Sequence, residues 1–323
     1  MSQVSHILVS GAGGGVGGVG RNVVRLLREQ DLPVRAFVHH DDERADTLRA
    51  LGADVFVGDL ERPSDVAEAL DGCRRMFFGM SVSPSYLEAA ATVATVARAT
   101  SELEVLVNIS QLTVSQMTAV STDQSHHQRL HYLAERVLDW SSLPVVQIRP
   151  TVFLENPFFT TLIAHAVQTE GVIALPFGTG RTSPVAAADV ARVITDVLQD
   201  PGPHVGQVYE LTGPQSQDVD GIAEEFSHAL GKPVTYRDVP LHEWAERVLA
   251  PVGLPEHLEH HLMTMARLHR ENRYDRRTLT VEQLTGRGAQ SVETFVAANA
   301  ELFTARAPGR RARAGAERAR PAS

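Results

Sequence analysis

ILVSGAGGGVGGVGRNVV, residues 7–24, decides the fold of this 323-residue chain. Residues 7–9 form the short apolar run that is typical of a buried parallel strand. Glycines then stand at every third position from 11 to 20, and the apolar residues of 23–27 recur at helical spacing. Glycine lets the backbone approach an anion closely, and the first N–H groups of the following helix point at it. The segment therefore predicts a pyrophosphate-binding turn rather than a flexible linker.

The spacing of these glycines allows two registers. In the first, the glycines at 11, 14 and 17 contact phosphate, and the additional GVG becomes a loosened first helical turn. In the second, a wider loop precedes a helix that begins at Gly17 and closes on Gly20. We favour the first register. The expected phosphate contacts are Gly11, Gly14, Gly15, Val16 and Gly17.

Composition excludes several classes of protein. Hydrophobic residues make up 43% and charged residues 21% of the chain, which is ordinary for a soluble globular protein. No apolar run approaches the ~20 residues of a membrane span. The single cysteine, Cys73, excludes an internal disulfide and fits a reducing, cytoplasmic location.

Charge is unevenly placed along the chain. Residues 305–323 carry six arginines and one glutamate, a net charge of +5. Since the whole chain has a net charge of −9, residues 1–304 have a net charge of −14. An acidic body argues against nucleic-acid binding as the main function. We expect residues 305–323 to be a disordered basic tail, because they lack apolar periodicity.

Beyond the glycine turn, short apolar runs alternate with helical patterns. Strands are expected at 33–38, 53–57, 75–80, 104–109 and 145–148, which predicts right-handed crossovers and a doubly wound parallel α/β sheet. The expected domains are a Rossmann-like NAD(P)-binding domain at 1–155, to which 187–213 returns, and a smaller, mainly helical substrate-binding region at 156–186 and 214–304.

The end of the second strand faces the adenosine ribose in such a fold, and an acidic residue there suits NAD. Here the strand is followed by His39, and Arg21, Arg35 and Arg44 are candidates to lie nearby, which favours NADP(H) over NAD(H). Asp41 and Asp42 could still reach a ribose, so the choice stays open at this point. We find no metal-ligand spacing and expect no metal.

Several further segments carry a family resemblance. In order they read GAGGGVGGVGRNVV, VRAFVHHDDERADTLRALGADVFVGDL, VNIS, HYLAERVLDWSSLPVVQIRPTVFLEN, LPFGTGRTSPVAAADVARVI and YELTGP, across residues 5–304. Together they resemble the NmrA-like NAD(P)-binding proteins, a branch of the atypical short-chain dehydrogenase/reductases. That family includes quinone reductases, triphenylmethane-dye reductases and redox-sensing regulators.

The resemblance implies cofactor contacts at residues that follow the strands. His39 would meet the 2′-phosphate, Asp59 the adenine amino group and Leu60 the adenine ring. Ser110 would lie beside the nicotinamide. The remaining implied contacts, along the ribose and the far side of the nicotinamide, are Met80, Ser81, Pro150, Thr151 and Phe153.

The catalytic residues depart from the family pattern. Members with a Tyr-x-x-x-Lys pair use the lysine to lower the tyrosine pKa, whereas here Tyr132 is followed by Arg136. Arginine does not exchange protons near neutrality. His131 could instead serve as general acid, because the unperturbed histidine pKa lies near working pH. We therefore name His131, Tyr132 and Ser110 as catalytic candidates; packing roles for His131 and Tyr132 are the alternative.

The expected function is an NAD(P)H-dependent reductase of a quinone, an enone or a related planar aromatic small molecule. Two alternatives stay open: a redox sensor that binds NADP(H) without turnover, and a non-redox isomerase or cyclase. The expected partner is the small-molecule substrate, with no membrane and no nucleic acid as main partner; a homo-oligomer is compatible with the sequence.

Overall fold

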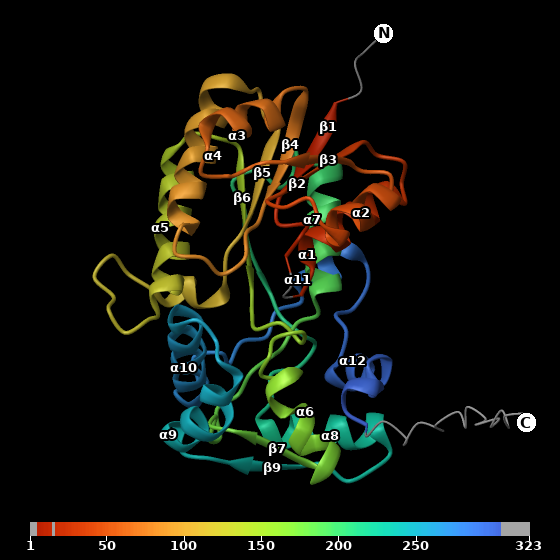
Figure 1. Cartoon of the computed structure of the whole chain (residues 1–323), viewed down its shortest axis with the longest axis vertical. Coiled ribbons are helices and arrows are strands. Elements are labelled where there is room, and N and C mark those ends of the chain that lie inside the picture. Colours follow the sequence, from red (N-terminus) through yellow and green to blue (C-terminus); the bar gives the residue numbers. More distant parts are fainter. Residues whose placement is uncertain (1–4, 15–16, 305–323) are drawn as a thin grey trace, which may run out of the picture.

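The computed structural model describes residues 5–14 and 17–304, and Figure 1 shows a larger sheet layer above a smaller region. Two expected phosphate contacts, Gly15 and Val16, lie outside the described residues, as does the basic tail at 305–323. None of the helices in the described part is both long and apolar enough to span a bilayer.

The larger layer is a parallel seven-stranded sheet, which confirms the predicted fold class. The order of its strands reverses between β1 and β4, and ligands of such sheets bind beyond the carboxyl ends of the strands at that point. In spatial order the strands are β3 (Asp54–Val57), β2 (Val34–Val38), β1 (His6–Val9), β4 (Cys73–Phe78), β5 (Val105–Ile109), β6 (Val145–Pro150) and β8 (Val208–Leu211).

Helices cover both faces of this sheet. One face carries α1 (Val19–Arg28), α7 (Ala187–Gln199) and α11 (Thr280–Thr285), and the other carries α3 (Pro63–Leu70), α4 (Tyr86–Thr100) and α5 (His126–Trp140). The short α2 (Glu43–Ala50) packs beside β3. α11 packs on α7 and β8, so this segment lies with the sheet and not with the substrate-binding region expected at 214–304.

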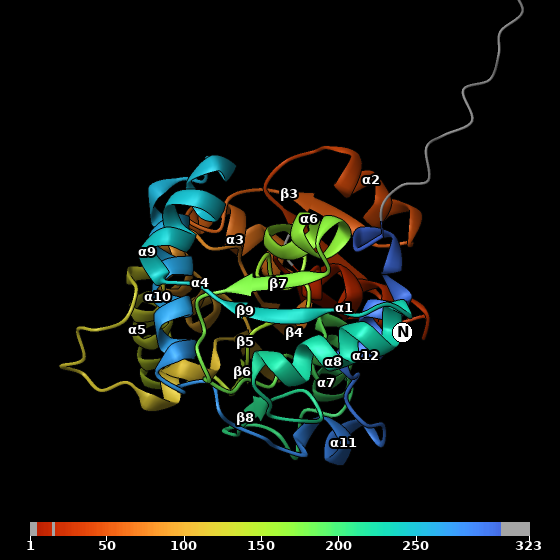
Figure 2. The same cartoon turned by 90° about the horizontal axis from the view of Figure 1, so that it is seen from below.

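The smaller region is built on a two-stranded parallel sheet of β7 (Val172–Leu175) and β9 (Thr235–Asp238). Figure 2 shows this sheet from below, with helices around it. Its core contains an aromatic cluster, in which the ring centroid of Phe158 lies 5.2 Å from that of Phe177 and 5.7 Å from that of Trp244. The helices are α6 (Thr161–Thr169), α8 (Val219–Leu230), α9 (Leu241–Trp244), α10 (Glu256–Arg270) and α12 (Val292–Ala298).

The loop is wider than the favoured first register predicts, and the helix begins two residues later than the second register predicts. Gly17 and Gly18 have φ of 67° and 60°, which a right-handed helical turn excludes, and α1 begins only at Val19. Gly20 is the glycine that packs the helix on the turn, because a Cβ there would lie 2.8 Å from the Ala12 nitrogen. The additional GVG thus lengthens the loop instead of loosening the helix.

Candidate functional site

Two cavities lie side by side at the carboxyl ends of the strands. The β2 cavity, of about 360 Å³, lies beyond β2 and β3, and the β5 cavity, of about 300 Å³, lies beyond β5 and β6. The residues common to both linings follow β1 and β4: Gly11, Gly14, Gly79, Met80 and Ser81. Because these five residues face both spaces, one elongated ligand could pass over the glycine turn and occupy both.

The β2 cavity has a cationic side chain at its edge. Arg44 donates to the Gly13 carbonyl at 2.9 Å and pairs with Asp42. Asp42 also caps α2, and the hydrogen bond from Arg44 lowers the pKa of its carboxyl to about 2. His39 and Asp59 line the same cavity. Asp42, Asp59 and Glu61 supply carboxylates, and Arg44 is the one arginine or lysine among the described residues that line this cavity.

The β5 cavity is lined by neutral side chains only, within the described residues. Ser110 and Thr151, at the ends of β5 and β6, are about 5% and 4% exposed. Neither hydroxyl has a hydrogen-bond partner among the residues that the structure describes. A buried hydroxyl without a partner costs free energy, so these two groups are suited to a polar ligand that enters the cavity.

Three histidines form the wall of the β5 cavity opposite the strand ends. His131 and His127, one turn apart on α5, are joined by a 3.0 Å contact between their Nε2 atoms. The His261 ring of α10 lies 4.9 Å from that of His127, and its Nδ1 is 2.8 Å from the Ser125 hydroxyl. The cluster therefore joins the sheet layer to the smaller region.

Burial changes the protonation expected for these rings. It lowers the pKa of His127 to about 4 and of His261 to about 3, and it lowers the pKa of His131 well below its ordinary value. The candidacy of His131 as general acid rests on the unperturbed histidine pKa, and burial moves its pKa well below that value because it disfavours the imidazolium. His131 reaches the cavity as a neutral ring, and any proton that it gives comes from a neutral N–H.

Other candidates lie differently from the prediction. Tyr132 lines neither cavity; it follows His131 and so points about 100° further round the helix, with the Arg136 guanidinium 5.6 Å from its ring centre. Gly17 also lies outside both linings and packs towards Ala187. The structure gives no support to contact of either residue with a ligand in these cavities.

The described residues bring the remaining candidates together. In the β2 cavity these are His39, Asp59 and Leu60; in the β5 cavity they are Ser110, His131, Pro150, Thr151 and Phe153; and Gly11, Gly14, Met80 and Ser81 line both. The roles assigned to them stay predictions.

A buried ion pair holds α5 on the sheet. Glu135, one turn beyond His131, is fully buried and accepts from Arg149 of β6 through both of its oxygens, at 2.9 and 2.5 Å. Above it, the Tyr86 ring lies 4.1 Å from that of His131, and its hydroxyl donates to the Ile109 carbonyl at 2.8 Å. These contacts fix His131 relative to the ends of β5 and β6.

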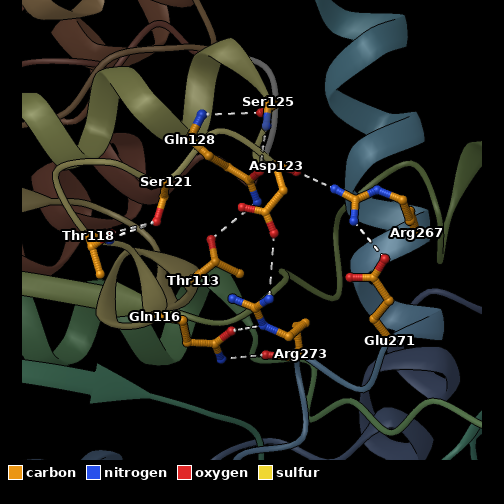
Figure 3. Close-up of polar contacts among 10 residues, drawn as sticks. All are labelled: Thr113, Gln116, Thr118, Ser121, Asp123, Ser125, Gln128, Arg267, Glu271 and Arg273. Carbon is orange, nitrogen blue, oxygen red and sulfur yellow. Dashed lines mark hydrogen bonds and ion pairs between the residues drawn. The ribbon is translucent and has the colours of Figure 1, made fainter.

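A polar network fastens the outer wall of the β5 cavity (Figure 3). The 3-10 turn η1 (Leu112–Gln116) is tied to the smaller region because Gln116 donates to the Arg273 carbonyl at 2.7 Å. Arg273 also faces Asp123 at 3.8 Å, and Arg267 donates to the Asp123 carbonyl while pairing with Glu271. The loop from η1 to α5 is thereby attached to α10.

α10 supplies a part of the site that the sequence does not predict. Leu258, His261 and Met265 line the β5 cavity, as does Tyr274, which follows α10. Their i, i+3, i+7 spacing puts the first three on one face of a helix, but the neighbouring sequence does not indicate which element that face packs against. His127, in the first turn of α5, also lines the cavity. No group of three or more His, Cys, Asp or Glu side chains in residues 5–14 and 17–304 could hold a metal ion.

Known proteins resemble this chain in sequence and in fold. A sequence profile described as NAD(P)H-binding matches residues 14–201. An NAD(P)H azoreductase from Xenophilus azovorans is 30% identical over 292 residues, which cover 90% of this chain and 98% of that one. Two solved structures are similar in fold. The first is an NADPH-dependent quinone oxidoreductase from Escherichia coli complexed with NADPH, which aligns with this chain at a TM-score of 0.78 and 23% identity, covering 91% of this chain and 99% of that one. The second, a Citrobacter sp. triphenylmethane reductase complexed with NADP(H), has a TM-score of 0.77 at 21% identity and the same coverage.

Proposed function

The chain belongs to the NAD(P)H-binding, NmrA-like family, and from that premise we propose that it is an NAD(P)H-dependent reductase of a planar conjugated molecule such as a quinone, an enone or an azo compound. The observation that carries the proposal is the pair of joined cavities, with a cation at the edge of one and only neutral side chains around the other. The azoreductase activity named for a relative that aligns along 98% of its length supports the same reaction class.

The residues present fit a dinucleotide. The glycine turn leaves backbone exposed between the cavities, because Gly11 and Gly14 line both and Gly11 has no room for a side chain beside the Gly79 carbonyl. The unpartnered hydroxyls of Ser110 and Thr151 suit the polar carboxamide of a nicotinamide. The Gly11–Gly14 turn would hold the pyrophosphate, and Asp59 with Leu60 would hold the adenosine.

When bound, the reduced nicotinamide supplies the hydride. The chain's own contribution is to place the substrate and to exclude water. Phe153, Met265 and Leu258 give the β5 cavity apolar walls for a planar substrate, while His131 offers a neutral imidazole. The described lining has no charged side chain, so it suits uncharged substrates and cations whose charge is spread over a conjugated system, since a localised unpaired charge would lose its hydration on entering.

Within this proposal we place the preference for NADPH over NADH on Arg44. Arg44→Ala is expected to weaken NADPH binding about 10-fold and NADH binding little, because one charge-assisted hydrogen bond to the 2′-phosphate contributes about 1.5 kcal/mol. Isothermal titration with both nucleotides measures this. Arg49→Ala is the matched control: Arg49 stands on the same helix, pairs with Asp41 and Asp46, and lines neither cavity. Equal losses for both nucleotides in Arg44→Ala would contradict the assignment.

The proposed activity is tested by mixing purified protein with NADPH and one member each of four substrate classes: a neutral quinone, an enone, a neutral azo compound and a triphenylmethane dye cation. Loss of the reduced-nicotinamide absorbance is followed together with product formation. We expect oxidation of NADPH well above the protein-free rate with at least one class. Tight nucleotide binding with no turnover in any class would overturn the proposal and favour the sensor alternative.

A further inference from the structure

The paired rings of His127 and His131 form a second chemical feature of the β5 cavity. Both residues line the β5 cavity, and both are almost completely buried, at 9% and 7% exposed. Their Nε2 atoms lie 3.0 Å apart, at hydrogen-bonding distance. The Nδ1 atom of each ring is buried and has no hydrogen-bond partner within the described part of the chain.

This geometry fixes how the two neutral rings share protons. A neutral imidazole has one N–H and one lone pair, so in an Nε2–Nε2 hydrogen bond one ring is protonated at Nε2 and the other at Nδ1. The pair therefore has one free Nδ1–H donor and one free Nδ1 acceptor. Burial lowers the pKa of both rings, so neither rests as an imidazolium at neutral pH.

We propose that His131 and His127 form a proton relay that supplies the proton consumed when the substrate is reduced. The inference rests on the proposed reductase function. His131 is the end that meets the substrate, because Tyr86 and the end of β5 hold it beside the strand ends, whereas His127 stands in the first turn of α5 next to the exposed His126.

The relay balances the reaction. When a hydride from the reduced nicotinamide adds to a quinone, an enone or an azo bond, an oxygen or nitrogen of the substrate is left as an anion that needs one proton. His131 gives up its Nδ1 proton to that anion and takes the Nε2 proton of His127 in its place. His127 then takes a proton from water at Nδ1. Both rings end neutral with their tautomers exchanged, and the nicotinamide ends oxidised. After the product leaves, water in the cavity returns a proton to Nδ1 of His131, the Nε2 proton passes back to His127, and His127 releases its Nδ1 proton, which restores the starting tautomers.

The choice of substrate separates a relay from a structural role. A triphenylmethane dye cation becomes neutral on accepting hydride and needs no proton, whereas an azo bond leaves a strongly basic nitrogen anion and a quinone a weaker oxygen base. We expect His127→Gln to slow azo reduction about 100-fold, within the range of general acid catalysis. Quinone reduction should slow less, and dye reduction should stay within about 2-fold. His260→Gln, an exposed position next to His261, is the control.

Comparable losses with azo compound, quinone and dye would overturn the relay while leaving the reductase function intact. Absence of turnover by the wild-type protein with every substrate would overturn the function itself. A second measurement needs neither turnover nor a variant. Nitrogen–proton correlation spectra of the histidine-labelled wild-type protein should show one of the two rings protonated at Nδ1 and the other at Nε2. The same tautomer in both rings, or a charged ring at neutral pH, would contradict the relay.

Discussion

Gly14→Val should abolish measurable nucleotide binding. Gly14 lines both cavities where they join, and a Cβ at this position would lie 3.2 Å from the Gly11 carbonyl oxygen and 3.3 Å from the Ser81 hydroxyl. The two methyl groups of valine would fill the passage that the dinucleotide must cross. A steric cost of about 3 kcal/mol corresponds to a loss in affinity of roughly 100-fold or more. Isothermal titration with NADPH measures the loss.

The control for Gly14→Val is Gly18→Ala. Gly18 has a φ of 60°, so alanine there is strained by about 1 kcal/mol, but the residue lines neither cavity and its Cβ would meet only the flexible Arg21 side chain. We expect a slightly lower melting temperature and unchanged NADPH affinity. If Gly18→Ala abolishes binding and Gly14→Val does not, the phosphate contacts lie in the second half of the loop.

The second large effect is expected from Arg149→Met. This change leaves the carboxylate of Glu135 fully buried, with only the 3.3 Å contact to Arg136 remaining. Removing one partner of a buried ion pair typically costs about 3–5 kcal/mol. The free energy of unfolding, from urea titration, should fall by that amount. Glu135 stands on the same face of α5 as His131, which lines the β5 cavity. A shift of this face should therefore also raise the KM for the substrate.

A double variant tests the physical reason. Glu135→Leu combined with Arg149→Met replaces the ion pair by apolar side chains, and such replacements are often neutral or stabilising. The double variant should therefore recover most of the stability that Arg149→Met loses. If both variants are equally unstable, the cost lies in packing and not in the unpaired carboxylate.

The sequence predicted the sheet well because each strand carries its own signal. The run at residues 7–9, the glycine turn and the alternation of apolar runs with helical patterns are local, and the structure places the predicted strands in one parallel sheet. β9 (Thr235–Asp238) escaped prediction, because TYRD is polar and only its pairing with β7 makes it a strand. The short helices α11 and α12 are likewise stabilised by packing rather than by a long periodic pattern.

The candidate site was predictable only where it follows strand ends. Ser110, Pro150 and Thr151 come directly after or at the end of strands, and that position alone implies the ligand edge. His261 and Tyr274 belong to the smaller region, and their place in the cavity depends on how α10 packs against α5. Protonation was also beyond sequence reasoning, because the lowered pKa of His131 comes from burial that only the folded chain creates.

Direct transfer of a hydride from NADPH to the substrate can be measured with an isotope label. NADPH carrying deuterium at both hydrogen positions of its hydride-donating carbon is incubated with the protein and an enone or a triphenylmethane dye cation, whose reduced carbon retains the label. Mass spectrometry of the product should find a single deuterium at that carbon, delivered directly from nucleotide to substrate in the joined cavities. Product without deuterium, or no product while NADPH binds, would contradict the account.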